Sequence, residues 1–403
     1  MSIINKGTGR QPCTRSKEWI LSCVLLFCSL CAFTQYKVQF VLNGFPAGHP
    51  KDSVFVAGNF NSWNPGITGS RISTKKDAAS IEIEGLPGGT YYYKFTRGNW
   101  QSVECLSNGN DLKDRALLLS SDTVITTSIE AWKDDFPNVE KKHTVSRNVH
   151  IMDTAFPMPQ LGRTRRIWIY LPPGYSKSKK RYPVMYMQDG QNLFDAYTAG
   201  FGEWEADETA DSLIRMGKPA CIIVGIDNGP DRLNEYNPYE FKDFGKGEGD
   251  RYVDFLAKSL KPYVDKRYRT LKTAENTIIA GSSMGALIAY YAMLKYPAVF
   301  GKGGIFSPAF WTAGEIKKLT DSCGKNLKGT LFFYIGGQEG DEYIKDMFDV
   351  TEKLGVNSSA LLYTVTDPES HHNEEAWRKW FPEFYNWVLA NGFNNIIKVE
   401  GED

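Results

Sequence analysis

Hydrophobic positions follow two different patterns along this chain, and the pattern changes near residue 143. Before that point, short alternating runs of apolar and polar side chains are separated by turns rich in glycine and proline. Alternation of this kind predicts β-strands. We expect them at residues 37–42, 53–57, 80–84, 90–95 and 116–127. An all-β stretch of about ninety residues is typical of a small β-sandwich of the immunoglobulin-like type.

Beyond residue 143, apolar strand-like runs alternate with amphipathic segments. We expect strands at residues 165–171, 182–187, 220–226, 276–280, 303–306, 330–335 and 360–365. We expect helices at residues 203–215, 252–263, 286–294, 343–354 and 374–389. Strands that alternate with helices predict a parallel sheet covered by helices on both faces.

A strand, a sharp turn and a helix at residues 276–294 stand at the centre of this second pattern. Ser283 lies between Gly281 and Gly285 in a G-x-S-x-G sequence. In a nucleophile elbow the serine backbone is strained, and strand and helix pass so closely that the residues two positions away need small side chains. An ordinary glycine-rich turn is the alternative, but the flanking strand and helix favour a nucleophile. With this elbow in the middle of the sheet, we predict the α/β-hydrolase fold.

A serine nucleophile needs a base within hydrogen-bond reach, usually a histidine. The chain contains five histidines, and the order in this fold is serine, acid, histidine. Only His371 and His372 follow Ser283, and the sequence S-H-H-N-x-x-x-W around them favours His372 as the base and His371 as its packing neighbour. We expect no metal at this pair, because no Cys, Asp or Glu cluster has ligand spacing to it.

The third triad member must orient the imidazole and stabilise its positive form. Glu339 and Asp341 both follow the predicted strand at residues 330–335. Glu339 is closer to the strand and is the preferred acid, with Asp341 as the alternative. Either one could instead be a solvated loop acid or a cap for the following helix.

The oxyanion formed during attack needs two preorganised backbone donors. The N–H of Met284 is expected to be one, because it directly follows the serine. The second should come from the loop after an early strand, residues 188–195, and Gln191 or Asn192 is the candidate there.

Several motifs of the second region together resemble the group of α/β-hydrolases that includes esterase D, enterochelin esterase and feruloyl esterases. The resemblance covers residues 145–393 and implies cleavage of acetyl or feruloyl esters on xylan, of siderophore trilactones or of small thioesters. It implies no metal and no organic cofactor. The motifs are Asp189-Gly190-Gln191-Asn192, Arg232-x-x-Glu235-Tyr236-x-Pro238, Gly281-x-Ser283-Met284-Gly285, Gly337-Gln338-Glu339 and His372-Asn373-x-x-x-Trp377-Arg378.

The first region resembles the starch-binding and glycogen-binding carbohydrate modules at residues 54–65 and 89–95. Those modules hold α-glucan with two tryptophans, which stack on sugar faces, and a lysine between them. Trp63 and Lys94 occupy matching positions, and Trp100 is the candidate for the second tryptophan. The resemblance implies an α-glucan or another polysaccharide as ligand.

Two departures from that module leave another interpretation open. Cys105 aligns with the later tryptophan, and the usual Asn-Arg ending is Asp114-Arg115 here. Trp63 and Trp100 would then be core or interdomain residues of a sandwich that serves as a spacer.

The N-terminus carries basic residues followed by an apolar run at residues 19–33, which is too short to span a bilayer comfortably. Ala32 and Thr34 stand where a signal peptidase requires small residues, so we expect a secretory signal at residues 1–34 and a periplasmic or extracellular protein. A retained membrane anchor is the alternative. The 47 basic and 47 acidic residues balance, which favours neither a nucleic acid nor an anionic membrane as partner.

The expected organisation is a signal peptide (1–34), a β-sandwich (35–130), a polar linker (131–142), a hydrolase domain (143–393) and a C-terminal tail (394–403). The predicted function is that of a serine carboxylic-ester hydrolase that forms an acyl-enzyme on acetyl or feruloyl esters of polysaccharides or oligosaccharides. Two alternatives stay open. One is a siderophore esterase, for which Arg232 is the basic residue near the site, and the other is a catalytically inactive glycan-binding protein.

Overall fold

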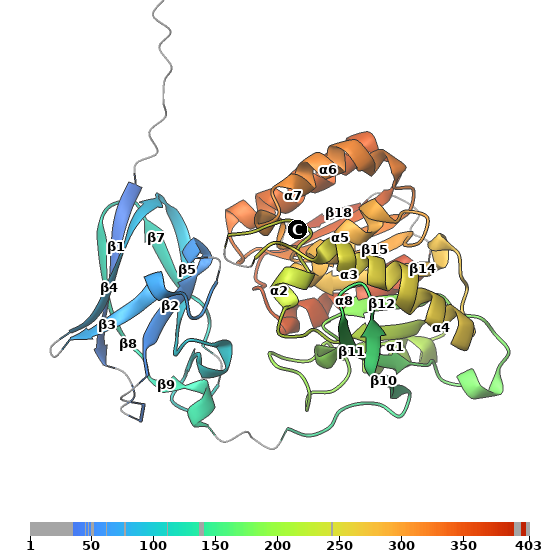
Figure 1. Cartoon of the computed structure of the whole chain (residues 1–403), viewed down its shortest axis with the longest axis horizontal. Coiled ribbons are helices and arrows are strands. Elements are labelled where there is room, and N and C mark those ends of the chain that lie inside the picture. The colour runs from blue at the N-terminus through green and yellow to red at the C-terminus, as the bar shows by residue number, and fades with distance from the viewer. Residues whose placement is uncertain are drawn as a thin grey trace, which may run out of the picture.

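The computed structural model describes residues 35–390, apart from positions 45, 47, 50, 51, 62, 76, 77, 111, 137–140, 243 and 244, together with residues 396–399. The predicted signal segment, 1–34, lies outside the described residues. Two regions lie side by side in Figure 1, an all-β region and a larger α/β region. No helix in the described part of the chain is long and apolar enough to cross a membrane.

The all-β region is built from one seven-stranded sheet and a short two-stranded pair. The sheet contains β1 (Gln35–Gly44), β2 (Val54–Gly58), β3 (Arg71–Lys75), β4 (Ala78–Pro87), β5 (Gly89–Thr96), β7 (Arg115–Leu119) and β8 (Thr123–Ser128). Its strand order is β7-β5-β2-β3-β4-β1-β8, and the short pair joins β6 (Glu104–Cys105) to β9 (Ala131–Trp132). The strands enclose a core that includes Phe40, Val56, Phe95 and Trp132.

This region differs from the sequence-based expectation in several places, among them the short strand β6, which was not predicted. The predicted strand at 116–127 is two strands, β7 and β8, and the polar strand β3 was not predicted. Residues 131–135 were expected to begin the linker, but β9 lies there and a 3-10 turn follows it. Trp132 explains the difference, because its side chain is buried in the core of the sheet and Arg97 lies over its ring.

A nine-stranded mixed sheet forms the centre of the α/β region. Its strands are β10 (Val149–Met158), β11 (Arg163–Tyr170), β12 (Val184–Gln188), β13 (Ile222–Ile226), β14 (Thr277–Ser282), β15 (Lys302–Phe306), β16 (Thr330–Gly336), β17 (Leu361–Asp367) and β18 (Ile396–Val399). The order is β10-β11-β13-β12-β14-β15-β16-β17-β18; β11 pairs antiparallel with both β10 and β13, and all other neighbours pair in parallel. β18 lies in the stretch expected to be a tail.

Helices cover both faces of this sheet, as the alternating pattern predicted (Figure 1). One face packs against α1 (Ala206–Arg215) and α8 (Glu374–Leu389). The other packs against α3 (Gly249–Phe255), α4 (Lys261–Arg267), α5 (Met284–Lys295), α6 (Glu315–Cys323) and α7 (Asp341–Asn357), and a π-helical turn, Leu256–Leu260, joins α3 to α4. A further short helix is α2 (Arg232–Glu235). The sheet and its two helical layers fit an α/β-hydrolase-like fold.

The strand order decides where loops meet. β14, β15, β16 and β17 are consecutive parallel neighbours, so the segments that follow them emerge at one edge of the sheet. Ligands of open α/β sheets bind at this carboxyl edge. Ser283, Glu339 and His372 follow β14, β16 and β17, so the fold places all three predicted triad residues there.

Candidate functional site

Ser283 occupies a strained turn between β14 and α5. Its φ of 57° and ψ of −124° are unusual for a residue with a side chain. The N–H of Ser283 donates to the carbonyl of Phe306 (2.9 Å), and the carbonyl of Ser283 accepts from the N–H of Ala309 (3.2 Å). The segment after β15 therefore holds the strained residue in place, and the Ser283 side chain stays partly exposed.

The two glycines of the motif are required by crowding. A Cβ atom added to Gly281 would lie 2.7 Å from the backbone carbon and oxygen of Gly285. A Cβ on Gly285 would lie 3.1 Å from the Asp189 carboxylate and 3.1 Å from the Cβ of Gln188. Strand, helix and the loop after β12 thus meet at the elbow, which is the close approach that the sequence motif predicted.

His372 pairs with Glu339 through its Nδ1, which lies 2.7 Å from Oε2 of the carboxylate. Glu339 is buried, and its Oε1 accepts hydrogen bonds from the N–H of Gly336 (2.7 Å) and the hydroxyl of Ser307 (2.6 Å). The indole N–H of Trp377 donates to the same Ser307 hydroxyl (2.9 Å). Glu339 is therefore held in one orientation, and it fixes the His372 ring in turn.

The charge of Glu339 tunes this histidine. Burial alone lowers the pKa of His372, but the charge and the hydrogen bond of Glu339 outweigh it, so that the pKa is raised above its usual value. Glu374 and Asp114 add to the rise. Asp341, the alternative acid, is the exposed first residue of α7. The structure thus places Glu339 rather than Asp341 against the imidazole.

Both expected sources of oxyanion donors lie next to the elbow. Met284 is the first residue of α5, where the N–H groups of the first turn have no intrahelical acceptor. Gln191 and Asn192 belong to a 3-10 turn directly after Asp189, the residue that packs on Gly285. Their side chains are occupied, because Oε1 of Gln191 accepts from Asn228 and the amide of Asn192 bonds to Glu374 and Gly200. The backbone N–H of Asn192 already donates to the carbonyl of Asp189 (2.9 Å), so the backbone N–H of Gln191 is the candidate donor that this turn retains.

Asp189 and Arg232 form a bidentate ion pair beside the elbow. Nε and Nη2 of Arg232 lie 2.7 and 2.9 Å from the two carboxylate oxygens, and the amide of Asn228 donates to the same carboxylate (2.6 Å). The guanidinium also lies over the ring of Tyr236. Since the charge of Arg232 is neutralised, this residue does not supply the positive pocket that a triply anionic siderophore complex would need.

Sequence reasoning assigned no role to Glu374, which follows His372 and Asn373 and begins α8. Burial raises its pKa to about 7. The amide of Asn192 lies 3.4 Å from its carboxylate, and the charges of His372, Asp189 and Arg232 all act on it. Its position directly after the histidine motif was the signal in the sequence. A buried carboxyl that titrates near neutral pH beside the base is a group able to influence the pH dependence.

The structure brings two of the three predicted sugar-binding residues together. The rings of Trp63 and Trp100 have centroids 6.2 Å apart and planes inclined at 42°, and both side chains are partly exposed. The amine of Lys94 lies 3.1 Å from Asp114, so its charge is paired.

One edge of the all-β region approaches the catalytic edge of the sheet (Figure 1). The amide of Asn59 donates to the carboxylate of Glu342 in the first turn of α7 (3.1 Å). The charge of Asp114 is close enough to His372 to raise its pKa. Lys94 pairs with Asp114, so among the predicted sugar-binding residues it is the one placed toward the triad.

A cavity of about 830 Å³ lies elsewhere in the α/β region. Basic side chains of α4 and the following loop line it, among them Lys261, Arg267 and Arg269. None of the predicted catalytic or sugar-binding residues lines this cavity. We therefore locate the candidate site from the triad geometry and not from the size of a cavity.

Comparison with known proteins supports an ester hydrolase. The family described as "Putative esterase" matches residues 159–386, more than half of the chain. An uncharacterized protein of Bacillus subtilis (strain 168), YbbA, is 32% identical over 249 residues, which cover 58% of this chain and 95% of that protein. An endo-1,4-beta-xylanase/feruloyl esterase of Xylanibacter ruminicola is 27% identical over 236 residues, covering 57% of this chain and 30% of that enzyme.

Two further matches concern the fold and the remainder of the chain. The crystal structure of the BES protein from Bacillus cereus superposes with a TM-score of 0.51 at 18% identity, over 63% of this chain and 99% of that one, which shows a shared fold. An alpha-amylase of Niallia circulans is 34% identical over 91 residues, 22% of this chain and 7% of that enzyme.

Proposed function

Because the chain belongs to the esterase family, it is a carboxylic ester hydrolase, and we propose that it works through Ser283 as nucleophile and through an acyl-enzyme. The observation that carries this proposal is the His372–Glu339 pair. Ser307 and Gly336 hold that pair at the sheet edge where the strained Ser283 turn also lies. Nucleophile, orienting acid and base thus follow β14, β16 and β17, at the carboxyl ends of four consecutive parallel strands, which suits the triad mechanism.

The proposed reaction has two halves. Ser283 Oγ attacks the ester carbonyl while Nε2 of His372 takes its proton, and the imidazolium then gives that proton to the leaving alkoxide. The backbone N–H groups of Met284 and Gln191 stabilise the oxyanion. Water, activated by the same imidazole, hydrolyses the acyl-enzyme and releases the acid. Glu339 stabilises the imidazolium in both halves.

We propose that the substrates are acetyl or feruloyl esters of polysaccharides or oligosaccharides. The relative whose name includes feruloyl esterase supports this choice, as does the 91-residue match to an alpha-amylase, a stretch about the size of the all-β region. Trp63 and Trp100 would supply apolar faces for sugar rings. Lys94 would contact the same sugar chain at a point closer to the triad. The paired charge of Arg232 disfavours a siderophore complex as substrate.

Hydrolysis of p-nitrophenyl acetate by the wild type, Ser283→Ala and Ser322→Ala tests the mechanism. Ser322 is an exposed serine on α6 whose hydroxyl donates to backbone carbonyls of the same helix, so Ser322→Ala is a matched control. We expect Ser283→Ala to lose nearly all activity and Ser322→Ala to keep it. If neither the wild type nor Ser283→Ala hydrolyses this ester or acetylated and feruloylated xylo-oligosaccharides, an inactive glycan-binding protein would be favoured.

We further propose that residues 1–34 direct export and are removed. Mass spectrometry of the mature protein from its host would show a chain that starts at Gln35. An intact N-terminus found in the membrane fraction would instead support the anchor.

A further inference from the structure

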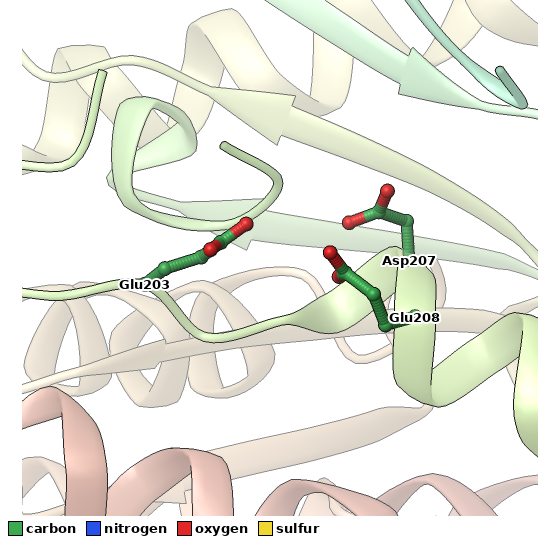
Figure 2. A group of neighbouring side chains, drawn as sticks. All are labelled: Glu203, Asp207 and Glu208. Atoms are coloured by element: carbon green, nitrogen blue, oxygen red, sulfur yellow. The ribbon is translucent and has the colours of Figure 1, made fainter. Parts of the chain in front are cut away.

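Three carboxylates gather outside the triad, where the loop after β12 enters α1. Glu203, Asp207 and Glu208 each offer an oxygen atom, and these atoms all lie within 4.8 Å of one another. Figure 2 shows the three side chains turned toward a shared space between the loop and the first turn of α1. Glu203 and Asp207 are buried, at 5% and 0% exposure. Buried negative charges at this spacing repel one another strongly unless something neutralises them.

The hydrogen bonds around the cluster satisfy only part of it. The hydroxyl of Thr144 donates to the Glu203 carboxylate (2.9 Å), and the N–H of Ser146 donates to Oδ2 of Asp207 (2.7 Å). In the described part of the chain, Oδ1 of Asp207 and Oε2 of Glu208 are buried and have no hydrogen-bond donor. Buried acceptors without a donor are rare in folded proteins. Asp207 and Glu208 lie within hydrogen-bonding reach of each other, so either a shared proton or a cation would supply the missing partner.

Neighbouring charges add to the repulsion. Burial, and after it the charges of Asp207, Glu205 and Asp195, raise the pKa of Glu203 to about 7, although the Thr144 hydroxyl opposes the rise. Burial and Asp207 raise the pKa of Glu208 to about 9. The charges that act most strongly on these two groups are thus all carboxylates, so the cluster favours the uptake of a proton or of a cation.

A proton and a metal ion are the two ways to supply that charge. One proton can bridge the oxygens of Asp207 and Glu208, but it does not engage Glu203, whose oxygen belongs to the same cluster. A calcium ion binds oxygens at about 2.3–2.6 Å, so two ligands of one ion lie at most about 5 Å apart. The measured spacing meets that condition for all three residues at once. A set of oxygen ligands without sulfur or imidazole also suits a hard cation better than zinc.

We propose that Glu203, Asp207 and Glu208 bind one calcium ion. The ion connects the start of α1 with the loop that precedes it. Trp204 follows Glu203, and its backbone N–H donates to the carbonyl of Asn192 (2.8 Å). The ion therefore steadies the turn that carries the oxyanion candidates, and it takes no part in breaking the ester bond.

Calcium binding is measurable on the whole wild-type chain after chelation and dialysis. Titration calorimetry should show one site for Ca²⁺, and terbium luminescence excited through Trp204 should appear and be displaced by Ca²⁺. At about 100 times Kd, Ca²⁺ should raise the Tm of the α/β region by roughly 5–10 °C. Absence of binding heat, terbium signal and Tm shift at millimolar Ca²⁺ would overturn the proposal. A response to Mg²⁺ alone would overturn the assignment to calcium.

Two variants separate the metal from a shared proton. Asp207→Asn combined with Glu208→Gln should abolish the calcium-dependent Tm shift. The matched control is Glu205→Gln, which removes a carboxylate from the same segment that pairs with Arg378 outside the cluster; it should keep the shift. Suppose that Ca²⁺ does not change the Tm of the wild type and that Glu208→Gln has the same Tm as the wild type. A protonated carboxyl pair then takes the place of the metal, and the proposal fails.

Discussion

The two regions of this protein hold their chemically important side chains in different ways. Around the elbow the orienting acid has three defined partners: Glu339 is bonded by His372, Ser307 and Gly336. In the all-β region, Trp63 and Trp100 are partly exposed and lie against each other. A catalytic group must be positioned closely to act, whereas a surface that stacks on sugars needs only an accessible flat face. Changes at the first site should therefore abolish turnover, and changes at the second should weaken binding.

The largest effect short of removing the nucleophile is expected from Glu339→Gln. The amide preserves shape but removes the charge that stabilises the imidazolium, so kcat should fall by about 10⁴-fold. Asp341→Asn is the matched control, since Asp341 is exposed at the start of α7 and should leave kcat close to the wild-type value. A large loss of kcat in Asp341→Asn with little loss in Glu339→Gln would show that Asp341, and not Glu339, is the triad acid.

The residual activity of Glu339→Gln gives a second readout with a definite sign. The base must be neutral, and Glu339 raises the pKa of His372, so wild-type activity falls as the pH drops through a value above the usual one for histidine. Without the Glu339 charge the pKa falls, and the acidic limb of kcat/KM should move to lower pH. A limb that stays in place or moves to higher pH would contradict the role of Glu339.

Next in size is the effect of a methyl group at the elbow. Gly281→Ala would place Cβ 2.7 Å from the Gly285 backbone, which cannot give way as a flexible side chain can. We expect a loss of about 3 kcal/mol in unfolding free energy, because overpacking typically costs about 1–3 kcal/mol and the clash is with backbone. Scanning calorimetry of the thermal unfolding of the α/β region measures this loss.

Gly355→Ala serves as the control for that experiment. Gly355 lies within α7 and has nothing within 4 Å of an added Cβ. Alanine there should stabilise the helix by about 0.5–1 kcal/mol. Equal tolerance of alanine at Gly281 would show that the strand and the helix are not in close contact at the elbow.

The smallest effect belongs to the all-β region. Trp63→Ala or Trp100→Ala should weaken binding of soluble α-glucan or xylan about 10-fold, since a lost aromatic contact of about 1.4 kcal/mol is tenfold in Kd. Hydrolysis of p-nitrophenyl acetate should not change. Leu118→Ala removes an exposed apolar side chain of β7 and should bind as the wild type does. Unchanged affinity in both tryptophan variants would make the pair structural.

Much of the α/β region could be predicted because its central strands are buried on both faces and read as continuous apolar runs. All seven residues of β16 are buried, for example, whereas most of β10 is exposed or partly exposed. β10 was missed for that reason. The short helix α6 was missed as well, and β18 lies in a stretch that had been expected to be a tail.

Within the site, Ser283, Glu339 and His372 could be predicted because the order of residues along an α/β-hydrolase chain restricts the choice. The supports of these residues could not. Ser307 is 32 residues from Glu339, and Asn192 is 182 residues from Glu374, so only the folded chain reveals that each pair is in contact.

Covalent labelling tests the central claim most directly. A p-nitrophenyl phosphonate ester reacts with an activated serine hydroxyl and leaves a stable adduct. We predict one equivalent of adduct by intact mass, located by peptide mapping on Ser283, loss of ester hydrolysis in step with labelling, and no labelling of Ser283→Ala. An adduct on another residue, or full hydrolysis by a chain that carries the adduct, would contradict the assignment of Ser283 as nucleophile.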